Sequence, residues 1–588
     1  MKRKPILFFS SLILIAGCSI IGVHFKIHNP HRAGKFPEKT EARVLLGNED
    51  SKYRTCYDVK YYKLNVIFPD QLKKDHSISG FVVIGATAKK DFDTLQIDLA
   101  KQFQISRITA NDIHHPEKAL FDFSKMSEAK FFRKENAVFV IMPRHILASE
   151  SFGISIQYSG IPVEAKRPPW AGGFVRKEDK LKKTWWGVAC EGEGASTWWP
   201  CKDVLNDEPD SVDVILSVPD YLAAISNGKL ISTETPGLVD GKDRTNWHWH
   251  VSYPINIYDI TFYIGNYKLL HDTYYSEVTH DTLQLNHYVL EQNYDIAKTH
   301  FQQLKKYLAF YEKTFGPYPW YRDGFKLVES PYEGMEHQSA IAYGNGFKND
   351  PVNGFDYIIL HETAHEWWGN AVTANDLSDM WLHEGFATYA EALYVESTKG
   401  HIAYLNYLLQ YRIFIINRRP VVGEQGIRYF NYKDTDIYMK GAWVLHSLRY
   451  AIGNDSLFFD ILHSFYMENR MKEISSDALE EIVNRKTGKD FHWFFEQYLH
   501  NRFTPELEYC VSDGKLFYRW GKTNPDFKIQ VGHTISDQPG FTAIYPVADQ
   551  IQSEILENPK QPIFFNTNEF LFKPVENKNL AKEFKKQK

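Results

Sequence analysis

The segment His361-Glu362-Thr363-Ala364-His365, followed by Glu384, constrains this chain more than any other feature of its 588 residues. Side chains four positions apart lie one above the other on a helix, so both imidazoles can reach one metal ion. Eighteen residues separate His365 from Glu384, enough for a second helix to return a carboxylate to the same place. Two histidines and one glutamate leave the fourth tetrahedral position of a zinc ion open. The segment therefore predicts a catalytic zinc site carried by two helices.

Residues around these ligands are assigned supporting roles. Glu362 lies about 100° round the helix from His361, so it is expected to face the attacking water and take its proton rather than bind the metal. Gly369-Asn370 is expected to end the first helix, and Ser378 to cap the second. Glu391 follows Glu384 by seven residues and shares its face. We expect it to accept a hydrogen bond from a ligating histidine.

The short HExxH pattern alone also occurs on solvated helix faces that bind no metal. The later glutamate decides between the two interpretations, because it stands in the context Trp381-Leu382-His383-Glu384-Gly385-Phe386-Ala387. This combination of motif and context favours the metal site.

Three further motifs accompany the zinc motif. Pro331-Tyr332-Glu333-Gly334-Met335-Glu336-His337 is similar to a GxMEN exopeptidase motif, and Tyr438-Met439-Lys440-Gly441-Ala442 to a YxKGA segment. Glu191 stands nine residues before Pro200-Cys201-Lys202-Asp203. This resembles a pattern in which a Gln or Glu precedes a PCxD motif at the same distance. From about residue 50 to 505 the chain resembles the zinc aminopeptidase family of aminopeptidase N and leukotriene hydrolase.

The resemblance implies a role for each matching residue. His361, His365 and Glu384 would hold one Zn²⁺, with Glu362 as general base and Tyr438 as donor to the oxyanion. Gly334, Met335, Glu336 and Glu191 would bind the substrate, the two acids holding its free α-ammonium. The partner implied is a peptide with a free N-terminal amine.

Three positions depart from the family pattern. His337 replaces an Asn and Glu333 replaces a small residue, both beside the expected substrate backbone. His383 replaces an Asn next to the zinc glutamate. We expect His383 to pack or to form hydrogen bonds rather than to act as a fourth ligand.

The expected fold is a multidomain α+β chain. Residues 51–260 read as short strands parted by polar breaks, and 261–504 are mainly helical, with a helix from Asn293 to Phe315. Residues 505–588 read as a small β-sandwich with a basic tail. The resemblance makes the first unit a saddle-shaped β domain and the second a thermolysin-like zinc domain. The long helical C-terminal domain of most family members has no counterpart in this sequence.

The N-terminal sequence predicts where in the cell the protein is located. Residues 1–25 combine a basic start, an apolar stretch and Ile15-Ala16-Gly17-Cys18, which resembles a bacterial lipoprotein signal cleaved before a lipid-carrying Cys18. An uncleaved single-span anchor is the alternative. Residues 26–50 are polar and are expected to act as a tether. Either form places the protein in a bacterial cell envelope, attached to a membrane.

Composition argues against nucleic acid as a partner and leaves a disulfide between Cys190 and Cys201 open. With 68 basic and 73 acidic residues the net charge is −5, which gives no electrostatic case for nucleic acid. Besides Cys18 the chain has Cys56, Cys190, Cys201 and Cys510. Cys190 and Cys201 are close enough in sequence to pair, but sequence alone does not decide this.

Two other functions compete with the aminopeptidase. A thermolysin-like endopeptidase would share the zinc motif but has no anchor for a terminal amine, and Glu336 and Glu191 argue against it. A non-catalytic surface lipoprotein on the same fold would be expected to have lost a ligand or the base, and all are present. The preferred N-terminal side chain, the oligomeric state and any epoxide-hydrolase activity do not follow from these residues.

Overall fold

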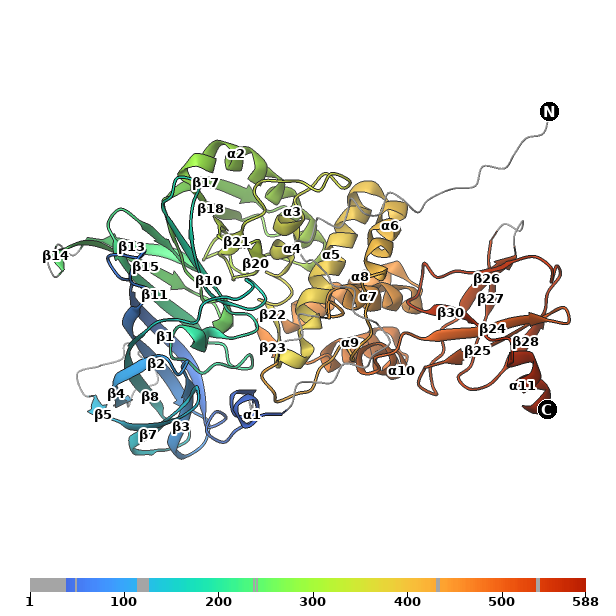
Figure 1. Ribbon diagram of the computed structural model, residues 1–588, viewed down its shortest axis with the longest axis horizontal. Coiled ribbons are helices and arrows are strands. Elements are labelled where there is room, and N and C mark those ends of the chain that lie inside the picture. The colour runs from blue at the N-terminus through green and yellow to red at the C-terminus, as the bar shows by residue number, and fades with distance from the viewer. Residues whose placement is uncertain are drawn as a thin grey trace.

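The computed structural model describes residues 39–47, 50–113, 126–235, 238–239, 242–429, 434–535 and 540–587. A β-rich unit lies at one end, helices occupy the middle, and a second β unit lies at the other end (Figure 1). The predicted leader with Cys18 lies outside the described residues, as does most of the tether. The described part of the tether includes α1 (Glu41–Gly47). No helix in the described part of the chain is both long and apolar enough to span a bilayer.

The N-terminal unit is built from three sheets. Its strands are β1 (Tyr57–Ile67), β2 (Ile78–Ala88), β3 (Phe92–Asp98), β4 (Gln104–Ile113), β5 (Ser127–Glu128), β6 (Lys130–Lys134), β7 (Ala137–Ile146), β8 (Ser151–Gly160), β9 (Gly173–Glu178), β10 (Thr184–Ala189), β11 (Ser211–Pro219), β12 (Ala223–Ile225), β13 (Lys229–Glu234), β14 (Leu238–Val239), β15 (Lys242–Val251) and β16 (Tyr263–Gly265). The largest sheet has the order β13-β15-β11-β1-β2-β8-β4-β5 with β14 on β15, and β3-β7-β6 forms another.

The third sheet carries the chain toward the helices. Its order is β12-β16-β10-β9, so β16, which lies past residue 260, still belongs to the β unit. Glu191 follows directly after β10, in a turn that ends at the 3-10 helix η2 (Ala195–Thr197). The end of β10 therefore presents Glu191 to the helical unit.

The middle unit combines a small sheet with helices. Its strands are β17 (Tyr267–Tyr275), β18 (Thr282–Leu290), β19 (Leu327–Glu329), β20 (Gly334–Met335), β21 (Ile341–Tyr343), β22 (Val372–Ala374) and β23 (Lys472–Ile474). Its helices are α2 (Tyr294–His300), α3 (Leu304–Phe315), α4 (Tyr357–Ala364), α5 (Trp381–Lys399), α6 (His401–Arg412), α7 (Met439–Ile452), α8 (Asp455–Asn469), α9 (Asp477–Thr487) and α10 (His492–Phe495), followed by a π-helical turn η7 (Glu496–His500).

Two features of this unit bear on function. The predicted helix from Asn293 to Phe315 is present as α2 and α3, joined by a 3-10 turn, and it stops at Gly316, whose φ of 127° suits glycine. The five-stranded sheet has the order β17-β18-β19-β21-β20, so β20 is an edge strand. An edge strand leaves backbone groups free to pair with another chain.

The C-terminal unit contains two small sheets and a helix. Its elements are β24 (Glu506–Ser512), β25 (Lys515–Gly521), β26 (Val531–Ile535), β27 (Thr542–Ile544), β28 (Gln552–Ile555), β29 (Ile563–Phe565), β30 (Lys573–Glu576) and α11 (Leu580–Gln587). The sheets have the orders β28-β25-β24-β30 and β27-β26-β29. The predicted basic tail folds as α11 because Leu580 and Ala581 are buried against the sheet.

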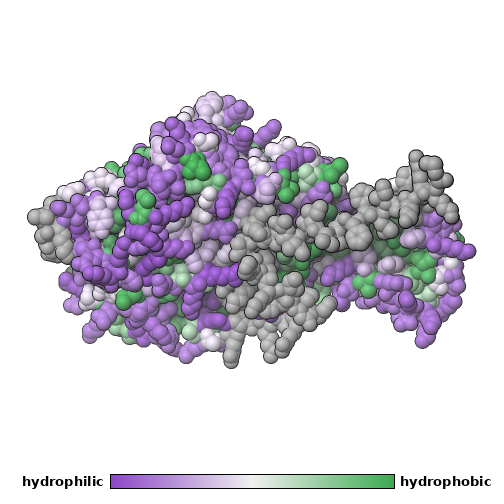
Figure 2. Space-filling view, turned by 45° about the horizontal axis from the view of Figure 1, so that its top comes forward, coloured by the Kyte–Doolittle hydropathy of each residue, from purple (hydrophilic) through white to green (hydrophobic). Residues whose placement is uncertain are grey.

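One continuous cluster of buried side chains runs from Cys56 to Phe572 through all three units. On the face in Figure 2, hydrophobic residues lie in small separate groups among hydrophilic ones. Cys56, Cys190, Cys201 and Cys510 are buried free thiols, so the possible Cys190–Cys201 disulfide is not formed.

Candidate active site

Helix α4 and the residue after it place both histidines on one face. The side chain of Asp356 caps the helix by accepting hydrogen bonds from the backbone N–H groups of Ile358 and Ile359. The helix ends at Ala364, earlier than the predicted Gly369-Asn370. His365 nevertheless keeps helical angles, φ −63° and ψ −22°, so its imidazole still lies next to that of His361, with 4.8 Å between the ring centroids.

Helix α5 supplies the third candidate ligand. The predicted cap Ser378 is wrong: Asp376 caps a 3-10 turn at Leu377–Asp379, and α5 starts at Trp381 without a side-chain cap. Because the 3-10 turn leads straight into α5, Ser378 lies inside the helical path. Glu384 falls in the first turn of α5, where its carboxylate faces the two histidines.

The three candidate ligand atoms have the spacing that a tetrahedral ion requires. Nε2 of His361 and Nε2 of His365 are 3.2 Å apart, and Oε2 of Glu384 lies 3.4 and 3.5 Å from them. Zn–N and Zn–O bonds of about 2.0–2.1 Å in tetrahedral geometry place neighbouring ligand atoms roughly 3.3–3.4 Å apart. Oε2 of Glu384 is buried and accepts no hydrogen bond from the described residues. The donor set therefore fits a zinc ion.

Both histidines are oriented through their other ring nitrogen. Nδ1 of His365 lies 2.9 Å from the carbonyl oxygen of Trp368, and Nδ1 of His361 lies 2.6 Å from Oε1 of Glu391. Each acceptor fixes the tautomer that leaves Nε2 free for a metal. The predicted acceptor role of Glu391 is thus confirmed, and Tyr407 and Tyr411 on α6 hold its other oxygen.

Glu362 faces β20, the edge strand that carries Gly334, rather than the zinc ligands. A Cβ built on Gly334 would stand 2.3 Å from Oε1 of Glu362, so this residue of β20 leaves room for the carboxylate. Burial raises the pKa of Glu362 to about 8; the two histidines lower it and the carboxylates of Glu336 and Glu384 raise it. Its proton affinity is therefore raised mainly by burial and adjusted by the charges beside it, in the direction that a general base requires.

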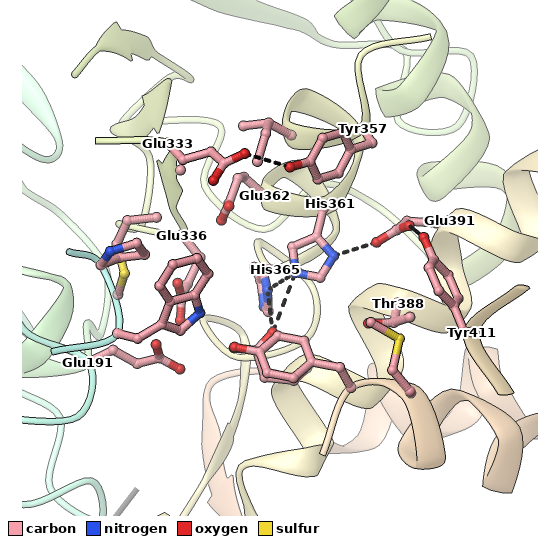
Figure 3. A pocket seen from close by; sticks show the side chains of 18 residues that line it. Glu191, Glu333, Glu336, Tyr357, His361, Glu362, His365, Thr388, Glu391 and Tyr411 are labelled. Atoms are coloured by element: carbon pink, nitrogen blue, oxygen red, sulfur yellow. Dashed lines mark hydrogen bonds and ion pairs between the residues drawn. The ribbon is translucent and has the colours of Figure 1, made fainter. Parts of the chain in front are cut away.

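Glu191 and Glu336 form a pair of carboxylates on one side of His365 (Figure 3). Burial raises the pKa of both, and that of Glu191 is raised further by Glu336 and Glu384. Glu336 accepts a hydrogen bond of 3.2 Å from the hydroxyl of Tyr258, but Oε1 of Glu191 is buried and has no donor among the described residues. Such a pair is stabilised by a bound cation.

Tyr438 reaches the site because two helices pass unusually close together. A Cβ on Gly441 of α7 would stand 2.9 Å from the Cα of Gly385 on α5. Only glycine at these positions allows that approach, and it brings Tyr438, just before α7, next to the Glu384 turn. The Tyr438 ring stacks on His361 with 6.4 Å between ring centroids.

All nine sequence-predicted site residues line one cavity of about 100 Å³. They are Glu191, Gly334, Met335, Glu336, His361, Glu362, His365, Glu384 and Tyr438. The same wall contains Pro169, Trp170, Tyr357, Thr388, Tyr411 and Met439, which sequence reasoning missed. Tyr357 had a usable signal, because it precedes His361 by four residues on the same helix face.

The departures from the family motifs fall in different places. His337 is buried outside the cavity, with Nδ1 2.7 Å from the hydroxyl of Tyr263. Nε2 of His383 accepts a 2.8 Å hydrogen bond from the backbone N–H of Ala374, which agrees with a hydrogen-bonding role. Glu333, in contrast, lines the cavity. Glu193 accepts from the backbone N–H of Gly172 and does not line it.

Comparison with known proteins finds aminopeptidases similar in sequence to this chain. Human endoplasmic reticulum aminopeptidase 1 is 24% identical over 395 residues, which cover 63% of this chain and 40% of that protein. Human aminopeptidase B is 27% identical over 252 residues, covering 39% of this chain and 35% of that protein. The chain thus spans less than half the length of these relatives.

Two solved structures share the fold. A two-domain M1 zinc metallopeptidase mutant bound to L-tryptophan has a TM-score of 0.63 at 21% identity, covering 76% of this chain and 95% of that one. An M1 zinc metallopeptidase mutant from Deinococcus radiodurans, bound to a Tyr-Ser-Ala substrate, has a TM-score of 0.61 at 20% identity, covering 78% and 98%.

A protein-family model matches most of the helical unit. Residues 299–498 match the peptidase family M1 domain, a range that contains the GMEH segment, both zinc helices and Tyr438. This part of the chain is therefore a peptidase family M1 domain.

Proposed function

We propose that the protein is a zinc-dependent aminopeptidase that removes the N-terminal residue from peptides. The observation that carries the proposal is the buried pair Glu191 and Glu336 beside the candidate zinc site, with Oε1 of Glu191 lacking a donor among the described residues. The α-ammonium group of a peptide supplies both the positive charge that this pair lacks and a donor for Oε1 of Glu191. Holding that group fixes the first peptide bond over the three ligands.

The residues divide the reaction among themselves. His361, His365 and Glu384 would hold a zinc ion, which would supply Lewis acidity for the scissile carbonyl and for the attacking water. Glu362 takes the proton of the attacking water and passes it to the leaving amine. Tyr438 donates a hydrogen bond to the developing oxyanion. Glu191 and Glu336 hold the ammonium group throughout and set the register of the chain.

An endopeptidase is the competing function. It would place peptide chain, not a terminal amine, beside Glu191 and Glu336, and both acids would remain buried without a cation. Loss of catalysis on the same fold is the other competitor. The intact spacing of the ligand atoms and the presence of Glu362 argue against it.

Matched peptides test the proposal. A peptide with a free amine should be shortened one residue at a time from its N-terminus, and its N-acetylated twin should be inert. Glu336→Gln should lose most turnover of the free peptide while keeping zinc, because truncating one partner of a buried charge pair costs about 2–5 kcal/mol. Product mapping by mass spectrometry measures both.

Glu193→Gln is the matched control, since Glu193 bonds to Gly172 outside the cavity and its loss should leave turnover near that of the unaltered protein. Glu191→Gln should resemble Glu336→Gln, because Glu193 is not placed to replace it. Internal cleavage of the acetylated peptide at a comparable rate would instead establish the endopeptidase.

We also propose that the protein is a lipoprotein of a bacterial cell envelope, anchored through Cys18. The support is the basic and apolar leader ending in Ile15-Ala16-Gly17-Cys18. Activity should then sediment with membranes, and mass spectrometry should find a lipid on the N-terminal cysteine. Cys18→Ser should remove that lipid and release any cleaved protein into the soluble fraction. An intact N-terminus at Met1 would establish the single-span anchor.

A further inference from the structure

Glu333 adds a carboxylate to the cavity wall that the proposed chemistry does not use. Its side chain is partly buried and lines the same cavity as the zinc ligands. Oε1 accepts a 2.7 Å hydrogen bond from the hydroxyl of Tyr357. In the described part of the chain, no lysine, arginine or histidine forms an ion pair with Glu333; the nearby Lys177 donates to the carbonyl oxygen of Pro331 instead. The carboxylate therefore faces the cavity with its charge uncompensated.

Its position along the site follows from β20. Glu333 immediately precedes this edge strand and Glu336 immediately follows it, so the two acids are three residues apart. At about 3.3 Å per residue the strand separates them by roughly 10 Å. Figure 3 shows Glu333 and Tyr357 beyond Glu362, away from Glu191. The base thus lies between the two acidic ends of the cavity.

A peptide bound in extended form along β20 has the same rise per residue as the strand. With its ammonium group at Glu336 and Glu191 and its first carbonyl beside Glu362, its chain continues toward Glu333. A residue of extended chain also rises about 3.3 Å, so the backbone of the residue after the scissile bond lies about a third of the way from Glu336 to Glu333, and a long side chain there spans the rest. That residue belongs to the leaving group.

We propose that Glu333 selects peptides whose second residue is lysine or arginine. This inference rests on the proposed aminopeptidase activity and deepens it by naming a substrate class. A guanidinium or ammonium group at that position pairs with the free oxygen of Glu333, while Tyr357 holds the other oxygen in place. A charge-assisted hydrogen bond in a partly buried site corresponds to roughly tenfold in kcat/KM.

The test compares peptides that differ only in charge at the second residue. The tripeptides Ala-Arg-Ala and Ala-citrulline-Ala have almost the same shape, but only the first carries a cation. The unaltered protein should prefer the arginine peptide by about tenfold, and Glu333→Gln should bring the ratio close to one. Glu333→Lys should reverse the preference, toward Ala-Glu-Ala over Ala-Arg-Ala. Ratios within each variant are unaffected by a change in overall rate.

Tyr357→Phe separates charge from mere shape. It removes the hydrogen bond but keeps the carboxylate, so the arginine preference should persist. If this variant loses the preference as completely as Glu333→Gln, the effect is structural and the assignment to the Glu333 charge is overturned.

Two other outcomes overturn the inference in distinguishable ways. Hydrolysis of all the tripeptides with equal kcat/KM in the unaltered protein leaves the aminopeptidase standing and removes the selectivity. Failure to cut any free-amine peptide removes the proposed function itself. A preference that follows arginine at the first residue, measured with Arg-Ala-Ala against citrulline-Ala-Ala, would place Glu333 on the wrong side of the scissile bond.

Discussion

Glu362→Gln should slow peptide hydrolysis severely while the protein stays folded and keeps its zinc. Glutamine preserves the length of the side chain beside Gly334 but cannot accept the proton of the attacking water. Losing a positioned general base costs roughly a hundred- to ten-thousandfold in kcat. Steady-state kinetics with a free-amine peptide measures the loss, and metal analysis of the same preparation should find about one zinc per chain, the number that a two-His, one-Glu site holds.

The contrast between rate and binding makes this variant informative. Because Glu191 and Glu336 are untouched, KM for a free-amine peptide should change far less than kcat. A rate that survives the substitution would show that another group accepts the proton. A preparation without zinc would instead show that Glu362 supports the metal, and the role assigned to it would fail.

Removing zinc should abolish hydrolysis completely and lower the thermal stability of the protein. Dialysis against a chelator leaves Oε2 of Glu384 buried without a hydrogen-bond donor and the Nε2 atoms of both histidines without a shared ion. Binding to the folded state alone contributes about 4 kcal/mol at a thousandfold excess over the dissociation constant. Activity assays and thermal unfolding with and without added zinc measure both effects.

Glu362→Gln serves as the control for that experiment. Its hydrolysis should stay severely slowed throughout, yet its unfolding temperature should fall on chelation and recover with zinc, as in the unaltered protein. Full activity in a sample shown to be free of metal would refute the proposed chemistry.

The zinc site was predictable because its geometry is largely local. The four-residue spacing of His361 and His365 needs only a helix, and the eighteen residues to Glu384 needed only a turn and a second helix. The acceptor role of Glu391 followed from the same periodicity. Exact helix ends did not, because the 3-10 turn before Trp381 and the early end at Ala364 depend on packing around the site.

The order of the β, helical and β units was also predictable from the sequence, although the exact extent of each unit was not. Alternating and amphipathic patterns indicated β, helical and β units in sequence, and the described structure has them in that order. The extension of the first β unit to β16 depends on pairing with β10 and β12. The helical fold of the chain end depends on burial of Leu580 and Ala581.

What the sequence by itself determined is the zinc-binding set, the base and the family resemblance that named Glu191, Glu336 and Tyr438. Only the tertiary structure decided which neighbours face the cavity. Glu333 and His337 both depart from the motif, yet β20 directs the first into the cavity and the fold buries the second against Tyr263. Glu191 and Glu193 stand two residues apart, and the turn after β10 sends only Glu191 inward. The physical reason is that helical spacing fixes contacts within about one turn, whereas the direction of a side chain on a strand end or in a turn is set by the sheets and helices packed around it.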